Sequence, residues 1–83
     1  MNKLYERYLS WRIERINSRK DKLEEENKKF SAEIRERDSV PNPSAFNLYN
    51  TRVCNVLIND NIGEILRLHF KLSKLEFKLD YAN

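Results

Sequence analysis

The sequence is short of the residues that stabilise many small domains. Its 83 residues include one cysteine, Cys54, and one histidine, His69. A lone cysteine cannot form a disulfide within the chain, and one cysteine with one histidine cannot supply the four ligands of a structural zinc site. We therefore expect Cys54 to be a small buried residue in a reducing compartment, and His69 to lie on the surface. Small chains without either device often gain stability by oligomerising, which predicts a homo-oligomer, most simply a dimer.

Long apolar runs are missing as well. The longest uninterrupted one is three residues, Val56 to Ile58, which is far too short to cross a bilayer. The first fifteen residues are charged throughout and lack the apolar core of a secretory signal. These features predict one small cytoplasmic domain over residues 1–83 that has no contact with a membrane.

Glycine and proline are scarce and unevenly placed. Residues 2–38 contain neither, and helix-forming residues dominate there. Pro41 and Pro43 then fall within three residues, which stops a helix and stiffens the chain. The sequence therefore predicts a helix over about 2–38, a connector over 39–44 and a separate segment over 45–83.

Apolar residues of the predicted helix recur at alternating spacings of four and three, as in a coiled coil. Lys20 and Asn27 complete the pattern at positions where a polar residue fixes register or orientation. A helix of this length spans about 54 Å. The rest of the chain looks too short to cover it, so we expect a second copy to do so. The predicted oligomer seam is Leu9, Ile13, Ile16, Leu23, Phe30 and Ile34.

The direction of the predicted helix pair is left open by the sequence. The first half of the helix is basic and the second half is acidic, which slightly favours an antiparallel pair. The alternative to a coiled coil is an ordinary amphipathic helix that packs on its own domain.

A second apolar set, Leu4, Tyr8 and Trp11, lies on another face of the same helix, with arginines interleaved. Either the chain's own C-terminal half covers this face or the face is an exposed contact patch. Trp, Tyr and Arg are the residues most enriched at binding hot spots. The predicted partner-binding residues are Tyr8, Trp11, Arg12, Arg15 and Arg19.

The C-terminal half alternates apolar and polar residues over 66–72 and 75–81. A helix would place these apolar residues on two opposite faces, whereas strands place them all on one. We therefore predict an α+β fold in which a small antiparallel β-meander packs on the long helix. Its hairpin is 64–72/75–81, and a third strand covers 52–58. The apolar face of the sheet is Val56, Leu66, Leu68, Phe70, Leu72, Leu75, Phe77, Leu79 and Tyr81.

Residues 45–58 also admit a helix. Ser44 would be its N-cap, and Phe46, Tyr49, Val53 and Leu57 would form its buried stripe. Frequent Asn, Thr and Val slightly favour a strand over 52–58. Phe46 and Tyr49 are expected in the core under both interpretations.

No catalytic, phosphate-binding or metal-binding motif is present, so we expect no enzyme activity, cofactor, metal or small-molecule substrate. The predicted function is a protein-interaction module that dimerises through its N-terminal helix and acts as a stoichiometric inhibitor or adaptor of a larger protein. Abundant Asn, Lys and Ile resemble the usage of AT-rich genomes, including bacteriophages and mobile elements. A phage-encoded inhibitor in the host cytoplasm is the specific hypothesis.

The alternative function is a nucleic-acid-binding regulator. Arg12, Arg15, Arg19 and Lys22 follow one another at helical spacing and form a basic stripe along the predicted helix. Such stripes attract phosphates. Interspersed acids and a net charge of only +3 weaken this interpretation.

Overall fold

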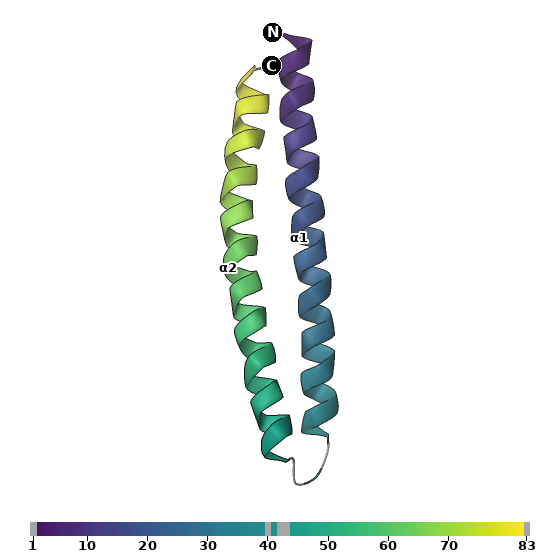
Figure 1. Ribbon diagram of the computed structural model, residues 1–83. Helices are drawn as coiled ribbons and strands as arrows, with labels where there is room; N and C mark the ends of the chain where they lie inside the picture. The colour runs from purple at the N-terminus through teal and green to yellow at the C-terminus, as the bar shows by residue number, and fades with distance from the viewer. Residues whose placement is uncertain (1, 40, 42–43, 83) are drawn as a thin grey trace.

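A computed structural model describes residues 2–39, 41 and 44–82 as a helical hairpin. Helix α1 spans Lys3–Asp38 and α2 spans Ala45–Ala82. The two helices lie antiparallel along their full length, so that the start of α1 is beside the end of α2 (Figure 1). The molecule measures 63 × 14 × 13 Å. Neither described helix holds an apolar stretch sufficient to cross a bilayer.

Polar caps define the ends of the helices. The Asn2 side chain accepts a hydrogen bond from the Leu4 amide at 2.9 Å and begins α1, which ends at Ser39. The Ser44 hydroxyl accepts a hydrogen bond from the Asn47 amide at 3.2 Å, which is the N-cap arrangement of the alternative helix considered for this segment. Residues 40, 42 and 43 of the predicted connector lie outside the described part of the chain.

The heptad residues of α1 face α2 of the same chain. Leu9, Ile16 and Leu23 are buried, whereas Ile13, Phe30 and Ile34 are partly buried. The rest of the chain covers α1 because it forms a helix of 38 residues, slightly longer than α1 with 36. Our expectation that the rest of the chain is too short to cover α1 is therefore wrong, and the predicted seam residues do not need a second copy to cover them.

The predicted β-meander is wrong, since the described residues of the C-terminal half, 44–82, contain no strand. Strand predictions at 52–58, 64–72 and 75–81 all fall within α2. The inward-facing positions of α2 recur at spacings of four and three, which is a second heptad. They are Cys54, Ile58, Asn61, Ile65, Leu68, Leu72, Leu75 and Leu79.

The strand-like alternation arises because α2 is apolar on two opposite faces. Leu68 and Leu72 point toward α1, whereas Leu66 and Phe70 point away from it and are 53% and 66% exposed. Read along the chain, the two sets interleave and imitate the period of a strand. The predicted sheet face therefore divides between core and solvent, with five residues on the outside: Val56, Leu66, Phe70, Phe77 and Tyr81.

Phe46 and Tyr49 are also misplaced by our sequence interpretation. They are 70% and 64% exposed, although both were expected in the core. Val53 and Leu57, from the same expected stripe, are exposed too. Ser44 does cap the helix, but the apolar stripe of the residues that follow it faces solvent and not α1. The side of α2 that faces α1 here carries Asn47, Thr51 and Cys54 instead.

The core is concentrated where α1 begins and α2 ends. Leu9, Ile16 and Leu23 from α1 form one cluster with Leu68 and Leu72, joined by Leu75. Toward the connector the contact between helices becomes polar. The Asn61 amide nitrogen donates to the Asn27 carbonyl oxygen at 2.9 Å and to Glu26 at 3.1 Å. These hydrogen bonds and the leucine cluster together set the register of the hairpin.

Leu68 and Leu66 provide a matched test of the helical assignment, because a strand would bury both and the hairpin buries only Leu68. Replacing Leu68 with alanine should lower the free energy of unfolding by about 2–5 kcal/mol. Leu66→Ala should cost less than half as much. Urea titrations followed by circular dichroism would measure both variants, and equal losses would contradict the described orientation of α2.

Candidate functional site

The outer side of α1 near its start is the most distinctive polar and aromatic surface. Leu4 and Trp11 are seven residues apart and lie directly opposite the seam that faces α2. Leu4 is 72% exposed, Trp11 is 52% exposed, and Tyr8 beside them is 49% exposed. The described part of the C-terminal half therefore does not cover this face, contrary to the first of the two readings that the sequence allowed.

Aromatic and arginine side chains stack along this face. The rings of Tyr8 and Trp11 are 6.4 Å apart between centroids, at an interplanar angle of 29°. The guanidinium carbon of Arg12 lies 5.8 Å from the Tyr8 centroid, and that of Arg15 lies 5.1 Å from the Trp11 centroid. The two rings are three residues apart and each arginine is four residues from its ring, the spacings at which side chains on a helix meet. We call these four residues the aromatic–arginine strip.

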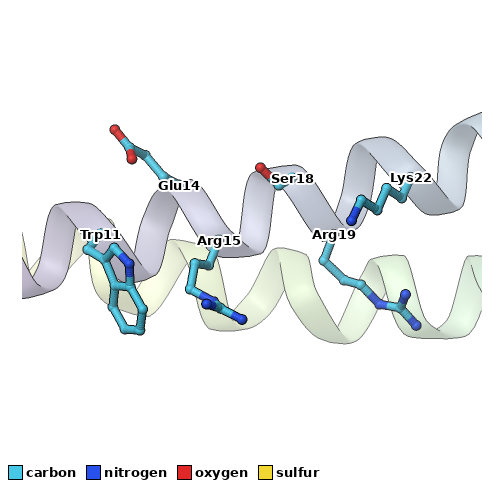
Figure 2. Close-up of a pocket in the computed structure, with 6 residues that line it drawn as sticks. All are labelled: Trp11, Glu14, Arg15, Ser18, Arg19 and Lys22. Atoms are coloured by element: carbon cyan, nitrogen blue, oxygen red, sulfur yellow. The ribbon is translucent and has the colours of Figure 1, made fainter.

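A shallow groove extends the strip along α1. Trp11, Arg15 and Arg19 project from the same side of the helix, whereas Glu14 projects away from them (Figure 2). The structure thus brings all five predicted partner-binding residues onto neighbouring positions of one helix. Glu14 and Ser18 were not singled out from the sequence, although their spacing from Trp11 places them at its edge. The groove is lined by Trp11, Glu14, Arg15, Ser18, Arg19 and Lys22.

A second surface, the outer face of α2, was not predicted at all. Two apolar hollows lie on it, one beside Tyr49 and Val56 and the other beside Phe70 and Phe77. The Phe77 ring also stacks on Tyr81, with centroids 5.7 Å apart. We define the α2 outer face as Phe46, Tyr49, Val53, Val56, Leu66, Phe70, Phe77 and Tyr81, which are all exposed.

Two further polar contacts lie elsewhere on the described helices. Arg67 donates two hydrogen bonds to Glu64, at 2.9 and 2.6 Å, and this contact holds the pKa of Glu64 below its usual value. Cys54 is buried, as predicted, with its sulfur 3.4 Å from Arg37 and 3.5 Å from Glu33. Within the described ranges, no three His, Cys, Asp or Glu side chains converge as metal ligands would.

No family model, curated protein or solved structure matches the chain. What the protein does must therefore be inferred from its own surfaces, of which the aromatic–arginine strip and the α2 outer face are the two most developed.

Trp11 is the only tryptophan, so its fluorescence reports directly on the strip. Because Arg15 lies over the ring, we expect the ratio of iodide to caesium quenching to be higher for Trp11 than for free tryptophan amide. Salt should lower this ratio by screening, and Arg15→Ala should lower it at constant salt. The same ratio for Trp11 in the unmodified chain and for the free amide would contradict the described stack.

Proposed function

We propose that this hairpin is a non-enzymatic protein-binding module that acts as a stoichiometric inhibitor or adaptor of a larger protein. The aromatic–arginine strip, extended by Arg19, is its binding surface. The observation that supports this most is the exposure of Trp11 and Tyr8 in an arrangement already stacked with arginines. Such side chains dominate the energetics of protein interfaces.

The helical setting of the strip lowers the cost of binding. Arg12 and Arg15 are flexible when free, and ordering such a side chain on binding costs about 0.5–1.5 kcal/mol. Their contacts with Tyr8 and Trp11 restrict them in advance. A straight helix that presents Leu4, Tyr8, Trp11 and Arg15 at successive turns matches the way amphipathic helices enter grooves on larger proteins.

The chemistry of the strip also restricts its target. Tyr8 and Trp11 need an apolar groove, and the arginines beside them need acidic side chains at its rim. We therefore expect a target surface with an apolar centre and an acidic border. A cytoplasmic location, and a phage or mobile-element origin with a host protein as the target, belong to this proposal and are supported by the single free cysteine and the residue usage.

Affinity capture of the tagged chain, read by quantitative mass spectrometry, tests the proposal. We expect one protein to be retained in about equimolar amount and to be lost from a Trp11→Ala, Arg15→Ala double variant. Because both side chains are exposed, the variant should keep the helical content of the unmodified chain.

The matched control is Lys29→Ala, Arg35→Ala, which removes two exposed bases from the other end of α1. This control should retain the captured protein. Equal capture by a folded Trp11→Ala, Arg15→Ala variant would show that the strip is not the binding surface.

Nucleic acid is the second candidate ligand, because the groove places Arg15, Arg19 and Lys22 along one line beside Trp11. Glu14 at the edge of this groove opposes phosphate. Fluorescence anisotropy with labelled DNA and RNA distinguishes the two functions. Binding that weakens steeply with salt would favour nucleic acid as the ligand. No binding at about 50 mM salt would exclude nucleic acid as the ligand.

A further inference from the structure

The α2 outer face contains a third heptad column, opposite the seam that faces α1. Tyr49, Val56, Gly63, Phe70 and Phe77 follow one another at intervals of seven residues. Apart from the glycine, each of these side chains is between 58% and 67% exposed. A strict interval of seven keeps a column straight along a supercoiled helix, as in the seam between two helices. The α2 outer face therefore resembles the contact surface of a coiled coil, but no described helix of this chain packs against it.

Gly63 lies at the centre of this column and of α2, which spans Ala45–Ala82. It is the only glycine of the chain, and glycine inside a helix weakens the helix. A Cβ atom added at Gly63 would meet nothing within 4 Å, so packing inside the hairpin does not require glycine here. Close approach of another helix would require it.

The column is symmetric about Gly63. Tyr49 and Phe77 are each fourteen residues from it, and Val56 and Phe70 are each seven residues from it. The smallest residue therefore lies at the centre, with larger side chains at equal distances on both sides of it. A two-fold axis at Gly63 places each residue of the column opposite the residue at the same distance on the other side of that glycine. The column therefore fits a second, antiparallel copy of the same helix, with the two backbones closest at Gly63.

We propose that two copies pair antiparallel through the α2 outer face, with the two-fold axis beside Gly63. The column then places Tyr49 opposite Phe77 of the second copy and Val56 opposite Phe70. The two α2 helices lie in the middle of a layer of four helices, and each α1 lies on the outside. This surface is separate from the aromatic–arginine strip, so the proposal does not depend on the proposed function.

The neighbouring column pairs with itself within one residue of the same register. It places Phe46 opposite Tyr81 of the second copy, Asp60 opposite Arg67 and Val53 opposite Lys74. Arg67 is held by Glu64 and leaves 58% of its side chain accessible, so it is available to a second carboxylate. Asp60, the one acid of this column, thus lies opposite a base of the second copy, and the aromatic residues at the two ends of the column contact each other across the interface.

The apolar area is sufficient for a stable pair. Five aromatic residues of the face are between 64% and 84% exposed: Phe46, Tyr49, Phe70, Phe77 and Tyr81. An aromatic residue buries about 150–250 Å² when it is fully covered, and part of each ring is already covered here. With Val53, Val56 and Leu66, complete coverage of the face would bury at most roughly 1,000 Å² per chain. A specific protein interface typically needs about 800 Å² per partner.

The mass in solution is the first test. Light scattering on the unmodified chain should give twice the 10.1 kDa of one chain. Phe70→Glu places a charge at the proposed interface and should halve the measured mass. His69→Glu, the matched control on the adjacent exposed residue, should leave it unchanged. A helical chain that stays at 10.1 kDa at high micromolar concentration, or a Phe70→Glu variant that remains a dimer, would overturn the proposal.

Cysteine crosslinking tests the direction and the register. In a Cys54→Ala background whose mass and helicity match the original, Gly63→Cys should oxidise to a covalent dimer, because it lies on the two-fold axis. Tyr49→Cys and Phe77→Cys should each fail to crosslink alone but should crosslink when mixed and reassociated. If each of these two variants crosslinks with itself, the two chains are parallel. If Gly63→Cys does not crosslink, the two-fold axis does not lie beside Gly63. Either result overturns the proposed antiparallel pairing.

Discussion

The hairpin depends on one contact, the line along which α1 and α2 bury leucine and isoleucine side chains against each other. Two helices without a third element can each cover only one stripe of the other. Leu9, Leu23 and Leu68 lie on that line and are almost fully buried. Each large apolar residue off the line, within the described part of the chain, is at least partly exposed, from Leu4 at one end to Phe46 near the connector. The same geometry therefore determines both the core and the apolar surfaces left exposed.

The contact between the helices is apolar near one end of the hairpin and polar near the other. Leucines near the start of α1 supply most of the apolar burial, whereas Asn27 with Asn61 and Cys54 with its charged neighbours occupy the half near the connector. A polar pair adds little stability but is satisfied in one register only. The antiparallel arrangement also places the basic start of α1 beside the negative end of the α2 dipole, where α2 has no base of its own.

The two helices were not equally predictable. For α1, the absence of glycine and proline gave its range to within a residue, and the spacing of Tyr8, Trp11, Arg12 and Arg15 placed them near one another. For α2, apolar residues on opposite faces produced a period of two at Leu66–Leu72, and only the long heptad from Cys54 to Leu79 distinguishes helix from strand. The partner of Asn27 and the α2 outer face become visible only once α2 is known to be helical.

The two proposed binding surfaces, the aromatic–arginine strip and the α2 outer face, can be occupied at the same time. The strip lies on the outside of α1, so pairing through α2 leaves both strips uncovered. Because the strip is near one end of each hairpin, antiparallel pairing places the two strips at opposite ends and on opposite sides of a body 63 Å long. Avidity requires that one target engage both sites at once, which strips facing in opposite directions prevent for a compact target. A pair of hairpins would instead hold two target molecules, one at each end.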